Sequence, residues 1–205
     1  GVDIHVWNDR PESVEGTLHV RLMRDGRDVV HEGSVPLSLD GGQTRTIAVE
    51  SVIGRFDDAA HAYRFGERAH DVVHAAWVRN ESSAEQASET PSSFLGQPII
   101  AEATLSLTGD ARPMTETELT VRVESRHADG AVVLSIAATS FAQLVRVGSA
   151  AYRASDSYFS LVSGVERRVR LELVDASSDP TILIEALNDA SPIVVRVTTS
   201  NDAGT

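Results

Sequence analysis

Apolar and polar residues alternate one by one along much of this chain. In the first clear example, Leu18, Val20 and Leu22 share one face, while His19 and Arg21 share the other. This period of two is typical of antiparallel strands with one buried face. The same alternation recurs over residues 119–124 and 168–173. No stretch carries an apolar stripe with the 3.6-residue period of a helix over three turns.

Turn-forming dipeptides fall between the alternating runs. Asp25-Gly26 suits a two-residue hairpin loop, and three similar junctions are Gly41-Gly42, Asp129-Gly130 and Ser163-Gly164. These junctions predict many short antiparallel strands, as in a sandwich or barrel. The strands are expected near residues 2–8, 15–24, 27–33, 43–50, 70–79, 99–108, 117–126, 131–147, 152–162, 165–174, 181–187 and 193–199. A short helix is an alternative over residues 52–58.

Residues 80–91 break the pattern because they include no large apolar side chain. Such a composition is typical of a linker or a long loop. An immunoglobulin-like (Ig-like) sandwich needs about 100 residues, so a chain of 205 residues has room for two. We therefore expect an all-β protein with two consecutive Ig-like, fibronectin III-like antiparallel β-sandwich domains. The expected division is a first domain over 1–82, a linker over 83–97 and a second domain over 98–205.

Composition narrows the classes of partner. The formal net charge of −12 disfavours binding to nucleic acid or to an anionic membrane, because both need a basic surface. No apolar run reaches the roughly 18 residues of a membrane helix. The chain has no Cys, which excludes disulfides and Cys-based metal sites and favours a cytoplasmic location.

Residue spacing offers no catalytic or cofactor site. His70 and His74 would share one face of a helix, but their neighbours predict a strand. On a strand their Cα atoms lie ~13 Å apart, too far to share one metal ion. The chain also lacks a nucleophile elbow, a phosphate-binding loop and a dinucleotide fingerprint. We therefore assign no catalytic, cofactor-binding or metal-binding residue.

Aromatic side chains are the candidates for contact with sugar rings, which stack on flat apolar surfaces. Trp77 follows an apolar run and is expected in the core. Trp7 precedes the Asn8-Asp9 turn and is expected at the rim. We take Trp7 and Tyr152 as the candidate carbohydrate contacts, while Tyr63 and Tyr158 are further aromatic residues to test.

The segment 155–164, Ser-Asp-Ser-Tyr-Phe-Ser-Leu-Val-Ser-Gly, predicts a strand and a tight turn, and 165–173 predicts the next strand. It resembles a segment near the C-terminus of β-mannosidases, which are exo-acting glycoside hydrolases of the β-galactosidase-like clan (family 2). The apolar and conformational positions match, namely Tyr158, Phe159, Leu161 and Gly164. The family's Asn, second Asp, Pro and Glu are replaced here by Ser157, Ser160, Ser163 and Val165. We interpret the segment as a hairpin of the second sandwich, with Gly164 supplying a positive φ.

A second resemblance lies at the other end of the chain. Residues 6–18, with Asn8-Asp9 as an Asx-type turn and a strand from Gly16, are similar to the start of the first sandwich that follows the β-mannosidase barrel. The resemblance implies two tandem accessory sandwiches of a family that keeps both catalytic Glu residues in its (β/α)₈ barrel. Since the chain opens at Gly1-Val2-Asp3, already inside a strand pattern, we expect a fragment of a longer protein.

The resemblance implies a function as well. We expect a non-catalytic C-terminal accessory region that braces the catalytic domain of its own parent chain and shapes its cleft for β-mannoside oligosaccharides. Homodimerisation is a further expectation. Two alternatives remain open: a free-standing carbohydrate-binding module, or an Ig-like spacer or adhesion pair of a surface protein.

Overall fold

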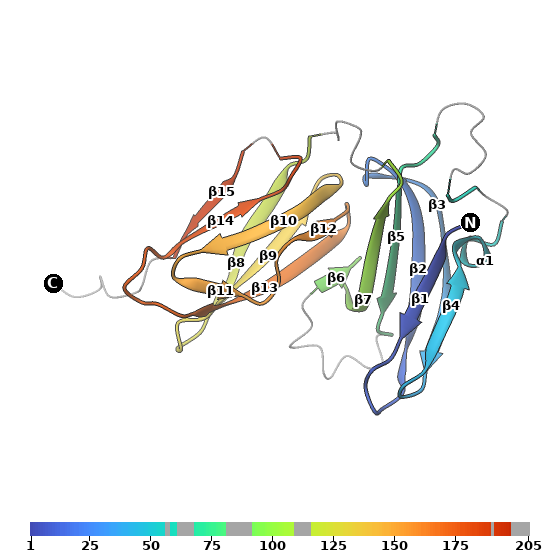
Figure 1. Ribbon diagram of the computed structural model, residues 1–205, viewed down its shortest axis with the longest axis horizontal. Helices are drawn as coiled ribbons and strands as arrows, with labels where there is room; N and C mark the ends of the chain where they lie inside the picture. Colours follow the sequence, from blue (N-terminus) through green and yellow to red (C-terminus); the bar gives the residue numbers. More distant parts are fainter. Residues whose placement is uncertain (56–57, 61–67, 81–91, 109–115, 190, 198–205) are drawn as a thin grey trace. The chain divides into compact units, whose positions relative to one another are not determined.

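The computed structural model describes residues 1–55, 58–60, 68–80, 92–108, 116–189 and 191–197. These residues form antiparallel strands with one short helix (Figure 1). The chain divides into two compact units, Gly1–Met114 and Thr115–Thr205. The expected all-β fold of Ig-like sandwiches is confirmed.

Unit 1 has two layers. One layer holds β3, β2, β5 and β7 side by side, with β6 as a short hairpin partner of β7. The other layer is the two-stranded sheet of β1 and β4 (Figure 1). The elements are β1 (Asp3–Trp7), β2 (Val14–Arg24), β3 (Asp28–Leu39), β4 (Thr44–Ala48), α1 (Val49–Ile53), β5 (Val72–Val78), β6 (Ser92–Phe94) and β7 (Gln97–Ser106).

The hairpins of unit 1 follow from residues that tolerate positive φ. Asp25 and Gly26 have φ of 52° and 59°, and Arg27 N donates to Arg24 O across the turn. Two consecutive positive φ values define the type I′ turn that matches strand twist. The predicted turn at Asp25-Gly26 is therefore confirmed, but the loop holds three residues instead of two, because Arg24 pairs with Asp28. Leu95 and Gly96 join β6 to β7 with positive φ values too, of 50° and 80°.

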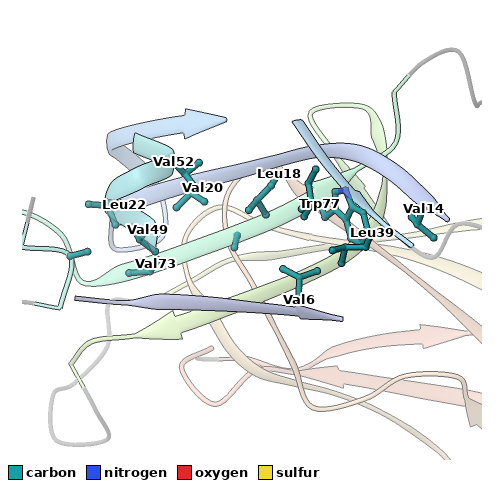
Figure 2. Packing of buried hydrophobic residues seen from close by; sticks show 13 residues of the cluster. Val6, Val14, Leu18, Val20, Leu22, Leu39, Val49, Val52, Val73 and Trp77 are labelled. Carbon is teal, nitrogen blue, oxygen red and sulfur yellow. The ribbon is translucent and has the colours of Figure 1, made fainter. Parts of the chain in front are cut away.

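The core of unit 1 lies between its two layers. Leu18, Val20 and Leu22 are buried as the alternation predicted. Val49 and Val52 of α1 lie against β2 and close one end of the cluster (Figure 2). The helix begins three residues earlier and ends five residues earlier than the helix expected over residues 52–58. It ends because Gly54 takes the left-handed conformation at φ 74°, and its N–H bonds to Glu50 O, which is a common helix stop.

Unit 2 is a sandwich of two four-stranded sheets. Its sheets run β11-β13-β9-β8 and β12-β10-β14-β15. Their inward faces are apolar and buried, for example at Leu134, Val169 and Ile184. The strands are β8 (Leu119–Arg126), β9 (Val132–Ala138), β10 (Ala142–Ser149), β11 (Tyr152–Ala154), β12 (Phe159–Leu161), β13 (Val165–Leu173), β14 (Thr181–Glu185) and β15 (Ile193–Arg196).

Two strands expected as continuous are each divided between the sheets of unit 2. The expected strand 131–147 is β9 in one sheet and β10 in the other. The expected strand 152–162 is likewise β11 and β12. The Ser163-Gly164 turn then joins β12 to β13, which belong to opposite sheets, so the predicted hairpin is instead a corner between sheets. Alternation continues through such a corner, because both sheets bury alternate side chains in the same core.

The division of the chain differs from the expected one. The strand near residues 99–108 was expected to open the second domain, but β7 pairs with β5 along its length, from Val72↔Ser106 to Val78↔Ile99. This ladder places β7 in unit 1 and moves the division to residues 114 and 115. Part of the expected linker, residues 83–91, lies outside the described residues.

Candidate functional site: a groove beside β1

A groove of about 390 Å³ runs along β1 in unit 1. β1 forms one wall, and the inner faces of β5 and β7 form the floor. This volume falls within the range of small-ligand sites. The lining residues are Ile4, His5, Val6, Trp7, Asn8, Asp9, Arg10, Val14, Leu18, Ala75, Trp77, Ile100, Ala101, Glu102 and Ala103.

The floor of the groove is part of the inner face of the larger sheet that the smaller sheet leaves uncovered. Directly paired residues share a face of a sheet, and Ala75 pairs with Ala103 while Trp77 pairs with Ala101. Ala75 and Trp77 are buried, whereas Ala101 and Ala103 are exposed. Leu105 continues the same face and is 46% exposed. The β1–β4 layer therefore covers β5 but not β7.

The wall of the groove is a strand edge with open backbone groups. Asn8 N donates to Gln43 O, and Val49 N donates to Val2 O, so the even-numbered residues of β1 direct their backbone groups toward β4. Because these directions alternate along an antiparallel strand, the N–H and C=O groups of Asp3, His5 and Trp7 point away from β4, toward the groove side. Within the described part of unit 1, β1 pairs with β4 alone.

Trp7 lies at the rim of the groove, as predicted, and its side chain is 66% exposed. The turn after it is fixed by Asn8, which is 5% exposed. Its Nδ2 group donates to Glu12 O, Leu39 O and Asp40 O at 2.8–3.2 Å. Its Oδ1 accepts from Arg10 N at 3.1 Å. The predicted Asx-type turn at Asn8-Asp9 is therefore confirmed.

Trp77 belongs to the core, as expected, with 3% exposure. β2 and β5 approach closely beside its ring because Gly16 has no side chain. A Cβ added at Gly16 would lie 2.1 Å from Val78 O and 2.8 Å from Trp77 Nε1. Gly16 thus allows the ring to sit at the closed side of the groove, where it presents an apolar surface.

The opposite face of the same sheet carries a cluster of Arg21, His19 and His74 around Phe94. The guanidinium carbon of Arg21 lies 4.3 Å from the Phe94 ring centre, and the rings of His19 and His74 lie 5.5 Å from it. His74 Nε2 also lies 3.5 Å from a carboxylate oxygen of Glu102. Burial lowers the pKa of Arg21, and burial together with the Arg21 charge lowers the pKa of His19.

The sequence did not reveal this cluster. The alternation placed Arg21 on the polar face of its strand, where a solvated side chain is the usual outcome, yet Arg21 is 7% exposed. Phe94 comes from a three-residue strand, which is too short to show a period. The two residues are brought together only by the β2–β5–β7 ladder and the β6 hairpin.

The aromatic candidates of unit 2 divide by burial. Tyr152 is 6% exposed, so its ring offers no open face to a sugar, and the expectation of a contact there is wrong. Tyr158 is 63% exposed and has a φ of 63°. Phe159 is buried under the Arg167 guanidinium, whose carbon lies 5.0 Å from the ring centre. Gly164 has the predicted positive φ, at 84°. Tyr63 lies outside the described residues.

Two features are absent from the described residues. No group of three or more His, Cys, Asp or Glu side chains is arranged to hold a metal ion there. His74 lies on β5, where a strand was expected, and His70 precedes it. Over the same part of the chain, no helix has the length and apolar character needed to cross a membrane.

Comparisons with known proteins show which proteins this chain is similar to. Residues 1–94 match the family model of the mannosidase Ig/CBM-like domain. The chain is also similar to a solved structure titled β-D-mannosidase from Dictyoglomus thermophilum, with a TM-score of 0.65 and 8% identity. That similarity covers 90% of this chain and 20% of the enzyme, so this chain spans about a fifth of the enzyme's length. No curated protein sequence matches the chain.

The resemblance predicted from the two sequence motifs is therefore confirmed: residues 1–94 match the mannosidase Ig/CBM-like domain model, and the chain shares its fold with part of a β-mannosidase. The family match falls on unit 1, which carries the Asn8-Asp9 turn and the groove. At 8% identity, the similarity to the solved enzyme concerns the fold alone.

Proposed function

We propose that this chain is a non-catalytic accessory region of a β-mannosidase-like glycoside hydrolase, and that it braces the catalytic domain of the same polypeptide. One observation carries the proposal. The structural similarity to a β-mannosidase extends over 90% of the chain and thus over parts of both units, while residues 1–94 match a mannosidase Ig/CBM-like family model.

The charged groups are consistent with a supporting role. A retaining glycosidase needs two carboxylates about 5 Å apart, one of them with a raised pKa. In unit 2, many carboxylates are instead held by Arg side chains, as in Arg146–Glu185 at 2.6 Å and Arg153–Glu172 at 2.7 Å. The contact with Arg153 lowers the pKa of Glu172, which is opposite to what a general acid requires.

Activity measurements test the proposal. The chain of 205 residues should release no nitrophenol from nitrophenyl β-mannoside, whereas the full polypeptide encoded by the same gene should release it. Turnover by residues 1–205 that persists after contaminating hydrolases are removed would contradict a non-catalytic role. An inactive full polypeptide, on a panel of nitrophenyl β-glycosides, would contradict the assignment to a hydrolase.

A second candidate function is carbohydrate binding, which the 66% exposure of Trp7 at the groove rim favours. Affinity electrophoresis on mannan should then retard the chain. Trp7→Ala should abolish the retardation, while Tyr158→Ala, which removes an equally exposed ring in unit 2, should preserve it. Unretarded migration of the natural chain would exclude a free-standing binder of mannan.

A further inference from the structure

We propose that the groove beside β1 binds one more β-strand, which hydrogen-bonds to the open edge of β1. This strand comes from the rest of the same polypeptide. The inference rests on the proposed function, since it assigns the occupant to a longer hydrolase chain. A strand fits because the groove combines a wall of backbone groups with an apolar floor, the two surfaces that strand addition requires.

The backbone groups define how the strand would pair. Asp3, His5 and Trp7 direct their N–H and C=O groups away from β4, as the ladder with Gln43 and Val49 shows. His5 Nδ1 bonds to Thr46 Oγ1 at 3.0 Å on the β4 side, so that contact leaves the backbone of the open edge untouched. An added strand would therefore bond to alternate residues of β1, starting at Asp3.

The floor defines the side chains that the strand would bring. Ala75, Ala101 and Ala103 leave a shallow apolar surface, on which alternate residues of an incoming strand can place larger apolar side chains. Burying the exposed Ala101 and Ala103 removes apolar surface from water, which stabilises the sandwich. The incoming segment should thus alternate apolar and polar residues.

The order of strands identifies the missing position. An Ig sandwich has one sheet in the order A-B-E-D and the other in the order C′-C-F-G. In unit 1 the larger sheet runs β3-β2-β5-β7, which corresponds to C′-C-F-G. The smaller sheet, β1 and β4, corresponds to B and E. The open edge of β1 is therefore the place of strand A, which directly precedes B in the chain.

A second copy of this chain does not fit the same place. The uncovered floor belongs to β7, which extends beyond β1 in the other layer. In each copy, β7 lies in the layer opposite β1 and extends past its open edge. If β1 of a second copy entered the groove, the β7 strand of that copy would therefore have to occupy the space beneath β1 of the first copy. A single extended segment avoids this clash. The mannosidase of similar fold is about four and a half times as long as this chain, which leaves ample polypeptide to supply it.

Hydrogen exchange at single amides tests the proposal. In residues 1–205, the amides of His5 and Trp7 should exchange quickly, while those of Ile4 and Val6 should be slow because β4 holds them. In a polypeptide that starts about 20 residues upstream in the same gene, His5 and Trp7 amides should exchange about 100-fold more slowly.

Two variants of the longer polypeptide sharpen the test. His5→Pro removes an N–H that faces the groove but no bond to β4, so a proline is tolerated at such an edge. Ala103→Glu places a charge on the floor at an exposed position. Both should restore fast exchange of the Trp7 amide while the fold is kept. Val29→Glu, at an exposed position of β3 outside the groove, should leave the protection intact.

Several outcomes would overturn the proposal. Fast His5 and Trp7 amides in the folded longer polypeptide would show that no strand is added. Slow amides already in residues 1–205 would show that the chain covers its own edge. Protection that grows with protein concentration would indicate a second copy, and protection produced by mannotetraose would indicate a sugar. These readouts are independent of mannosidase activity, so they separate this proposal from the proposed function.

Discussion

At the scale of single residues, Asn8 shows how one buried side chain fixes a turn. Its amide group donates to three backbone carbonyls, which come from the Glu12 turn and from the end of β3. Removing a buried donor leaves those acceptors unsatisfied. The side chain therefore connects the end of β1 to the end of β3.

Asn8→Ala should lower the free energy of unfolding by about 1–3 kcal/mol. The neighbouring Asp9→Ala, at an exposed position, serves as the control and should change it by less than about 0.5 kcal/mol. Urea unfolding followed by Trp fluorescence measures both. Equal stabilities of the two variants would contradict the anchoring role of Asn8.

Asp175 gives a prediction for acid pH. Hydrogen bonds from Ser177 and Ser178 lower the pKa of Asp175 to about 2 from an ordinary 3.8. Because the folded-state pKa is depressed, the stabilisation is complete above pH 3.8 and is lost as the pH falls toward about 2. An NMR titration of the carboxyl carbon should show this midpoint. The double variant S177A and S178A should raise the pKa toward 3.8, whereas Ser191→Ala should not.

At the scale of elements, Tyr158 marks the point where the chain passes from one sheet of unit 2 to the other. Its φ of 63° is costly for a residue with a Cβ, and Tyr158 N donates to Val145 O at 2.7 Å, which holds the corner. The ring is mostly in solvent. The backbone conformation, rather than burial of the ring, therefore defines the role of this residue in the fold.

Tyr158→Asn should leave the free energy of unfolding unchanged or raise it by up to about 1 kcal/mol, because Asn tolerates the left-handed region. Tyr152→Ala, which removes a buried ring from β11, should lower the free energy of unfolding by about 3 kcal/mol. Thermal or urea unfolding compares the two. A loss above about 1 kcal/mol in Tyr158→Asn would mean that the exposed ring makes a stabilising contact.

The predictions from sequence succeeded where one residue type dictates local geometry. Alternation located β2, β8 and β13, and Asp25-Gly26 and Gly164 produced the expected positive φ values. The predictions failed where contacts between segments distant in the sequence decide which residues are buried. The buried position of Arg21 depends on Phe94, more than 70 residues later in the chain. The groove depends on which strands the smaller sheet fails to cover, which no local pattern records.

At the scale of the whole molecule, the boundary between the units is the main correction. A polar stretch at 80–91 indicated a linker, but β7 follows that stretch and completes the sheet of unit 1 through its ladder with β5. A polar stretch can equally fall, along the sequence, between two strands that pair with each other, as β5 and β7 do. Such pairing leaves no mark on local composition.

Truncation tests the boundary. A polypeptide of residues 1–114 should unfold cooperatively, because it retains β7 and the whole core of unit 1. A polypeptide of residues 1–96 should not, since it leaves the backbone edge of β5 without its partner strand. Thermal melts by circular dichroism compare them. Cooperative melting of both at the same temperature would mean that β7 contributes nothing to unit 1.

The open edge of β1 also has a consequence for misassembly. A row of unpaired backbone groups beside an apolar strip is the template on which cross-β aggregates grow. Asp3 and His5 on this strand, with Asp9 and Arg10 just beyond it, oppose such growth by placing charge and polarity along it. When residues 1–205 are produced alone, these few side chains act as gatekeepers that keep the edge from recruiting other chains.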